Sequence, residues 1–105
     1  MTRCEVRLLT CKKGYRIASF FNNSSSYLDR IVPIIEIALN KFKKEQDYSR
    51  LFSDLSGEFD CSPVANTSYI YEIYLDTFSF KVFKVIYDSK RILWKKGKCI
   101  KEVFC

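Results

Sequence analysis

Hydrophobic and polar residues follow a two-residue period through much of the last third of the chain, residues 69–105. The pattern breaks at residues 76–77 and 88–89, where Asp-Thr and Asp-Ser are short enough to form hairpin turns. Strands joined by such short turns are usually antiparallel neighbours. The sequence therefore predicts a three-stranded antiparallel meander, with strands at residues 69–75, 78–87 and 91–96.

One further strand is predicted near the N-terminus. Residues 4–10 alternate imperfectly and are followed by Lys-Lys-Gly at residues 12–14, which is a turn signal. Residues 15–21 are apolar without a clear period, so we expect a short connector that turns one of its two phenylalanines inward. The polar run at residues 22–26 is expected to be a loop that supplies a helix N-cap.

Two helices are predicted between this strand and the meander. The first has the i, i+3, i+4 spacing of one buried helical face, at Leu28, Ile31, Ile35, Ala38 and Phe42. Because Pro33 lies inside this stripe, either the helix has Pro33 in its first turn or that turn is kinked. The second helix is predicted at residues 47–55, with Gly57 ending it. Residues 56–68 are expected to be irregular.

These elements predict one α+β domain over residues 1–105, a strand, two helices and three strands, with both helices on one sheet face. The hydrophobic fraction of 48% and the aromatic fraction of 16% are typical of a compact chain. Alternation predicts that Tyr69, Tyr71, Ile73 and Leu75 face the core. Glu72 lies on the opposite side, either as a buried partner of a lysine or as a solvated residue.

Few ligand types for a metal or cofactor are present. The chain has no histidine, and its five cysteines lack the C-x-x-C spacing, so we expect no metal, no cofactor and half-buried thiols in a reducing compartment. The absence of histidine also excludes Ser-His and Cys-His nucleophile pairs. The charged N-terminus lacks a signal-peptide pattern, and the apolar runs are far shorter than the ~20 residues of a membrane span. These features predict a cytoplasmic protein that does not enter a membrane.

Positive charge is concentrated near the C-terminus. The net charge is +6, and residues 81–101 contain eight Lys or Arg against the single acid Asp88. Cations and aromatics on one folded surface indicate a polyanionic partner, most simply nucleic acid. Trp94 is expected in the core, with a base-stacking surface as the alternative. Residues 95–98 have a plainer alternative as a solubilising end that protects an edge strand.

Several short blocks resemble the RelE/HigB-like toxins of bacterial toxin–antitoxin modules, and the phage-associated HigB branch in particular. The N-terminal and helical blocks that carry the resemblance are Glu5-Val6, Lys13-Gly14, Phe20-Phe21 and Leu51-Phe52-Ser53-Asp54-Leu55. The blocks in the meander are Ile70-Tyr71-Glu72-Ile73, Phe80-Lys81-Val82-Phe83, Tyr87-Asp88-Ser89 and Ile92-Leu93. The resemblance covers most of the chain, and each block is short.

The resemblance implies an endoribonuclease that cleaves mRNA without a metal, commonly on the ribosome, and that an acidic antitoxin protein neutralises. Such enzymes often use Lys, Arg and Tyr instead of paired histidines for proton transfer and charge stabilisation. Carried over by position, the catalytic candidates are Lys81, Lys95, Lys98 and Tyr87. The RNA-binding candidates are Lys84, Arg91, Lys96, Lys101 and Trp94.

The sequence departs from the family pattern at two positions. Tyr74 stands where the family strand has an arginine. Lys81 is a point charge where the family has a guanidinium, which binds phosphate in a bidentate manner. Two alternatives therefore stay open, a ParE-like gyrase inhibitor of the same fold and a non-catalytic basic adaptor for nucleic acid or an acidic protein.

Overall fold

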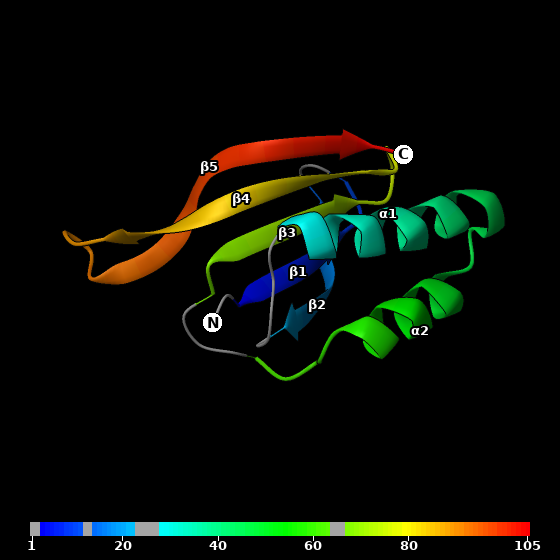
Figure 1. The fold of residues 1–105 in the computed structure, drawn as a ribbon, viewed down its shortest axis with the longest axis horizontal. Coiled ribbons are helices and arrows are strands. Elements are labelled where there is room, and N and C mark those ends of the chain that lie inside the picture. Colours follow the sequence, from blue (N-terminus) through cyan, green and yellow to red (C-terminus); the bar gives the residue numbers. More distant parts are fainter. Residues whose placement is uncertain (1–2, 12–13, 23–27, 64–66) are drawn as a thin grey trace.

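The computed structural model describes residues 3–11, 14–22, 28–63 and 67–105, and it is an α+β fold with two helices and a five-stranded mixed sheet (Figure 1). Its elements are β1 (Cys4–Leu9), β2 (Arg16–Asn22), α1 (Leu28–Glu45), α2 (Tyr48–Glu58), β3 (Tyr69–Tyr74), β4 (Ser79–Asp88) and β5 (Leu93–Phe104). The strand order is β2-β1-β3-β4-β5. The central strands β1 and β3 are parallel, and every other neighbouring pair is antiparallel.

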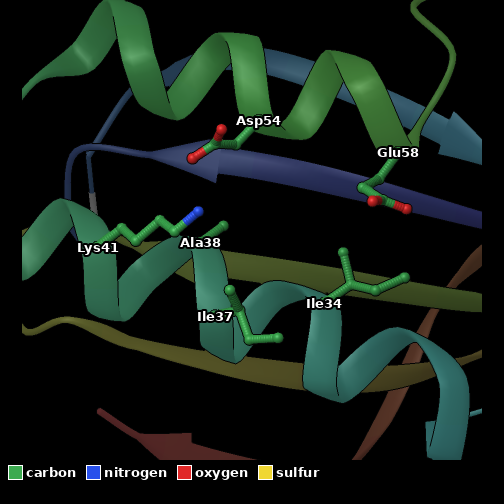
Figure 2. Close-up of a pocket in the computed structure, with 6 residues that line it drawn as sticks. All are labelled: Ile34, Ile37, Ala38, Lys41, Asp54 and Glu58. Atoms are coloured by element: carbon green, nitrogen blue, oxygen red, sulfur yellow. The ribbon is translucent and has the colours of Figure 1, made fainter.

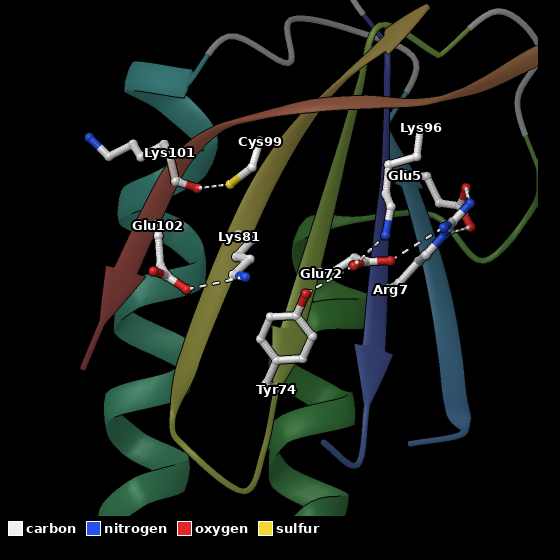
Figure 3. Close-up of polar contacts among 9 residues, drawn as sticks. All are labelled: Glu5, Arg7, Glu72, Tyr74, Lys81, Lys96, Cys99, Lys101 and Glu102. Atoms are coloured by element: carbon white, nitrogen blue, oxygen red, sulfur yellow. Dashed lines mark hydrogen bonds and ion pairs between the residues drawn. The ribbon is translucent and has the colours of Figure 1, made fainter. Parts of the chain in front are cut away.

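Both helices pack on the same face of the sheet. Figure 3 views the sheet from its other face, with the helices behind it. Alternate residues of β1, β3 and β4 meet the apolar stripes of the helices in one core, which includes Val6, Leu8, Tyr71, Ile73, Phe80, Ile31, Ile35, Leu39, Leu51 and Leu55. The predicted inward set of the β3 region is confirmed, because Tyr71, Ile73 and Leu75 are buried and Tyr69 packs against them. The helix-free face of the sheet is therefore left for polar chemistry.

The connector expected at residues 15–21 is wrong, because most of this segment is strand β2. It pairs with β1, placing Phe20 opposite Val6 and Phe21 opposite Glu5. Phe20 joins the core and Phe21 is half-buried, so alternation holds only at this end of the strand. The other end is exposed at the sheet edge, which hides the two-residue period. Two strands, not one, precede the helices.

The predicted stripe of α1 is confirmed, with Leu28 half-buried and the other four members buried. Pro33 lies in the second turn of α1, so the alternative that placed it in the first turn is wrong. Asp47 caps α2 by accepting a hydrogen bond from the Arg50 N–H at 3.2 Å. The predicted end of α2 is also wrong, because Gly57 has an ordinary helical place and α2 continues to Glu58. The turn at Lys12-Lys13 and the loop after Asn22 lie outside the described residues.

Strand β5 is twice as long as predicted, so Lys98 and Lys101 lie inside it. Pairing of β4 with β3 ends at Lys84, whereas pairing of β4 with β5 continues to Asp88. Residues 84–98, called the arm below, therefore form a two-stranded ribbon that projects past the rest of the sheet (Figure 1). The arm extends about 15 Å beyond β3, given the rise per residue of a strand.

Gly97 lies on the arm beside a register shift in the β4–β5 pairing. A Cβ at this position would lie 2.7 Å from the Lys84 carbonyl oxygen and 2.9 Å from the Ile86 Cγ2. We expect Gly97→Ala to destabilise the arm by about 1–2 kcal/mol, because the backbone must shift. Hydrogen exchange of the β4 and β5 amides measures this loss.

Gly57→Ala is the matched control, since a Cβ added there would meet nothing within 4 Å and the residue is helical. It is expected to stabilise the protein by about 0.5–1 kcal/mol through helix propensity. Equal exchange protection of the arm in the Gly97→Ala variant and the parent protein would contradict the close approach of the strands.

Candidate nucleic-acid interface

The arm carries nearly all of the chain's net charge. Residues 84–98 contain six Lys or Arg against Asp88, a net charge of +5, whereas the whole chain has +6. All six cationic residues are exposed, namely Lys84, Lys90, Arg91, Lys95, Lys96 and Lys98. Among the described residues, Lys84, Lys90 and Lys98 form no ion pair. The arm is therefore a concentrated positive surface with cations available to a partner.

An aromatic pair lies on the same ribbon. Tyr87 and Trp94 are register partners, with ring centroids 5.0 Å apart and ring planes at 55°. The exposed fractions are 48% for Tyr87 and 57% for Trp94, so the expected core position of Trp94 is wrong. The reason is geometric, because β3 ends before this level of the sheet, where β4 pairs with β5 on one side. The exposed rings have the accessibility that a stacking surface requires.

Asp88 organises the tip of the arm. Its Oδ1 accepts hydrogen bonds from the backbone N–H groups of Lys90 at 3.0 Å and Arg91 at 3.3 Å, and its Oδ2 lies 3.5 Å from Lys95 Nζ. The turn brings Ile92 into the left-handed region, with φ of 54°, and leaves 78% of that residue exposed. A β-branched residue rarely adopts this conformation, which costs an L-residue roughly 1–2 kcal/mol.

A row of alternating charges crosses the helix-free face at the base of the arm (Figure 3). Strand register aligns Arg7, Glu72, Lys81 and Glu102 across four strands. Arg7 Nη1 lies 3.4 Å from Glu72 Oε2, and Lys81 Nζ lies 3.6 Å from Glu102 Oε2. Opposite charges on directly paired strands stabilise a sheet. The two positive and two negative side chains of this row balance one another, whereas the arm has a net positive charge.

Glu72 is the centre of this polar group and is confirmed as a buried partner of a lysine. Lys96 Nζ donates to Glu72 Oε1 at 3.1 Å and lies 4.3 Å from the centroid of the Phe83 ring. The Tyr74 hydroxyl donates to the same carboxylate oxygen at 2.9 Å. Lys96 thereby ties the arm to the centre of the sheet.

These contacts set the protonation states of Glu72 and Tyr74. Burial would raise the pKa of Glu72, but hydrogen bonds from Lys96 and Tyr74, with the charges of Lys96 and Arg7, outweigh it and lower that pKa. Burial, followed by the hydrogen bond to Glu72, raises the pKa of the Tyr74 hydroxyl. At neutral pH, Glu72 is therefore ionised and Tyr74 is protonated.

The lowered pKa of Glu72 predicts a loss of stability in acid. A carboxyl whose pKa is lower in the folded state contributes its full stability above its unfolded pKa, which is about 4.3 for Glu. The contribution is lost as pH falls from that value through the folded pKa. Urea unfolding between pH 7 and pH 3 should show this loss, and Glu72→Gln should have a shallower pH dependence. Equal pH dependence in both proteins would remove Glu72 as the cause.

The predicted catalytic residues do not meet at one point. Lys95 is the register partner of Ile86, five residues along β4 from Lys81, which is about 17 Å at the rise of a strand. Tyr87 lies one residue further along the strand, beside the tip. Lys95 and Lys96 lie near the start of β5, so their predicted place near the end of that strand is wrong.

The predicted RNA-binding residues divide between the arm and the body. Lys84, Arg91, Trp94 and Lys96 lie on the arm, whereas Lys101 is the register partner of Val82 within the sheet. The ion pair between Arg7 and Glu72 was not predicted from the sequence. Both residues fall on the polar side of their strands, but their contact depends on the parallel pairing of β1 with β3.

A groove on the other side of the molecule lies between α1 and α2 (Figure 2) and is lined by Ile34, Ile37, Ala38, Lys41, Asp54 and Glu58.

Within the described ranges, no group of three or more Cys, Asp or Glu residues could hold a metal, and no helix is long and apolar enough to cross a membrane. Cys11 and Cys105 are half-buried as expected, whereas Cys4 is buried and Cys61 and Cys99 are exposed, so the expectation is wrong for these three. The arm thus remains the surface with the most distinctive chemistry.

Comparison of the chain with models of protein families, with curated proteins and with solved structures finds no match. The resemblance to RelE/HigB-like toxins therefore stays a prediction based on short sequence blocks.

Proposed function

We propose that this protein binds nucleic acid through the arm. The observation that carries the proposal is the net charge of +5 on residues 84–98, beside the exposed rings of Tyr87 and Trp94. A phosphate backbone gains affinity from each Lys or Arg that replaces a condensed counterion. Exposed aromatic rings add contacts with bases. The arm combines both features on a ribbon that a partner can approach from either face.

The charge states on the helix-free face favour binding over proton-transfer catalysis. Glu72 has a lowered pKa and is a weak base, and the raised pKa of Tyr74 makes its hydroxyl a weak acid. A general acid or base works best with a pKa near the operating pH. Glu72 and its partners therefore have the properties of a structural ion-pair group that supports the base of the arm.

Fluorescence anisotropy with labelled duplex and single-stranded oligonucleotides tests the proposal. Affinity should fall linearly on a plot of log affinity against log salt, with a slope of about −3 to −5 if four to six cations contact phosphates. Absence of binding at 50 mM salt, or a slope near zero, would contradict nucleic-acid binding by the arm.

A second candidate is the RelE/HigB-like activity, cleavage of mRNA by a toxin that an acidic antitoxin neutralises. One observation favours it: Lys81 is the register partner of Glu72, whose carboxylate also contacts the Tyr74 hydroxyl and Lys96. These are residue types that RNA cleavage without a metal can use to stabilise charge and transfer protons. This candidate requires the pKa values of Glu72 and Tyr74 to change when RNA binds.

Mapping RNA 5′ ends after induction in bacteria tests cleavage. New ends that disappear in Lys81→Ala but persist in Lys101→Ala would support the helix-free face as the catalytic site. Both lysines lie in the sheet outside the arm, so the pair separates a catalytic role from a general loss of positive charge. Folded protein without new ends would exclude the nuclease and leave the binding function.

A further inference from the structure

We infer that the arm binds duplex DNA and that Ile92, at its tip, inserts between base pairs as a wedge. The wedge requires the nucleic-acid binding proposed above and specifies the form of nucleic acid. Apolar side chains inserted at a base step unstack it and kink the duplex. Three features of the arm lead to this inference: the state of Ile92, the shape of the ribbon and the distribution of its cations.

In the unbound protein, both the exposure and the backbone conformation of Ile92 are unfavourable. It is the most exposed apolar residue of the arm, and its backbone has a φ of 54° that a β-branched residue rarely adopts. Neither cost is offset by packing within the protein, because 78% of the residue is exposed. Glycine or asparagine would suit this backbone better. Insertion between stacked bases would bury the Ile92 side chain and so offset the cost of its exposure.

The shape of the arm suits a groove of B-form DNA. The arm is a two-stranded ribbon that extends about 15 Å past β3; β-ribbons can bind in the minor groove, from which an apolar wedge enters the base stack and kinks the duplex toward the major groove. Beyond Val85, whose N–H donates to the Ser68 carbonyl oxygen at 3.0 Å, the described part of the ribbon pairs only within itself and can enter a groove without rearrangement.

The cations flank the tip along both strands. Lys90 and Arg91 lie in the turn beside Ile92, and Lys84, Lys95 and Lys98 follow towards the base. A ribbon within a groove has a phosphate backbone on each side, so this arrangement places positive charge near both. Neutralisation of phosphates around the inserted residue offsets part of the cost of the bend.

Single-stranded nucleic acid is the principal competitor for this surface. It would stack on Trp94, whose ring packs at 55° against Tyr87 and has an exposed side. Stacking alone gives no role to an aliphatic residue at the apex of the turn. The duplex uses Ile92 as well as the cations, and therefore accounts for more of the arm.

A 30-base-pair duplex with donor and acceptor dyes at its ends tests the wedge. The duplex is much shorter than the persistence length of about 150 base pairs, so its ends stay apart unless the protein bends it. Binding should raise energy transfer. A duplex with one central mismatch should bind about tenfold more tightly, because a mismatched step costs less to unstack.

Ile92→Asn removes the wedge and keeps a residue that tolerates this backbone. It should abolish the rise in energy transfer and the mismatch preference, while it leaves the salt dependence of binding unchanged. Ile37→Asn on α1 is the matched control, since Ile37 is 60% exposed and lies in the groove between the helices. This control should bend DNA as the parent protein does.

Three results would overturn the wedge. Absence of binding to any oligonucleotide would remove the proposed function and the wedge together. Salt-dependent binding without bending, or bending that persists in Ile92→Asn, would remove the wedge and keep the proposed function. Preference for a single strand that is lost in Trp94→Ala and retained in Ile92→Asn would assign the arm to base stacking instead.

Discussion

Replacing Glu72 with Gln is expected to lower the free energy of unfolding by about 3 kcal/mol, near the low end of the cost of removing one member of a buried ion pair. The loss arises because Glu72 is only 7% exposed, and its carboxylate contacts Arg7, Lys96 and the Tyr74 hydroxyl. Glutamine keeps the size and a hydrogen bond to Tyr74 but leaves Lys96 without its carboxylate, and it leaves Arg7 with Glu5 alone, at 3.1 Å. The partial exposure of both cations holds the cost at this level.

Glu102→Gln is the matched control for this substitution. Glu102 faces Lys81 in the same charge row, at 3.6 Å, but its side chain lies at the accessible edge of the sheet. Exposed ion pairs contribute about 0–1 kcal/mol, so this variant should unfold almost as the parent does. Urea denaturation at pH 7 measures both variants. Equal effects of the two substitutions would contradict a special role for Glu72.

The Glu72 variant also separates the two candidate functions. Loss of the carboxylate removes the negative charge that pairs with Lys96 Nζ and leaves an uncompensated cation on the arm. Binding of nucleic acid by the folded variant should therefore strengthen by a few-fold, about the gain from one more phosphate contact at moderate salt. A catalytic role for Glu72 instead requires that RNA cleavage disappears while the protein stays folded.

The core could be predicted because periodicity alone identifies it. The stripe of α1 and the alternation around Tyr71 depend on residues a few positions apart. Strand β2 could not be predicted in this way, because its exposed end at Arg16 and Ile17 lacks the contrast between two faces that produces a period. An edge strand needs little burial, so its sequence carries a weaker signal.

The candidate site was harder to predict because it depends on contacts between distant segments. The group around Glu72 requires β1 to lie parallel to β3, and it requires Lys96 to cross from β5 over Phe83. Neither of these contacts can be recognised from the spacing of hydrophobic and polar residues within one segment of the sequence. The exposure of Trp94 depends on its pairing with Tyr87 near the tip, beyond the level at which β3 ends. Charge concentration was visible in the sequence, whereas the shape that presents it was not.

The largest effect on binding is expected from two lysines of the arm. Lys90 lies in the turn and Lys98 near the base, both exposed and without an ion pair among the described residues. The double variant Lys90→Gln/Lys98→Gln should reduce affinity roughly 10- to 100-fold at 100 mM salt and make the salt slope shallower by about 1.8, for two lost phosphate contacts. Anisotropy titrations over a range of salt give both values.

Lys41→Gln/Lys44→Gln is the control with the same change in net charge. Both lysines are exposed on the last turns of α1, away from the arm (Figure 1). If nucleic acid contacts the arm, this control should keep the parent slope and lose affinity less than about threefold, because distant charges act only through a screened field. Equal losses in both double variants would mean that binding responds to net charge alone. Unequal losses locate the phosphate contacts on the arm, since the two proteins differ only in where the charge was removed.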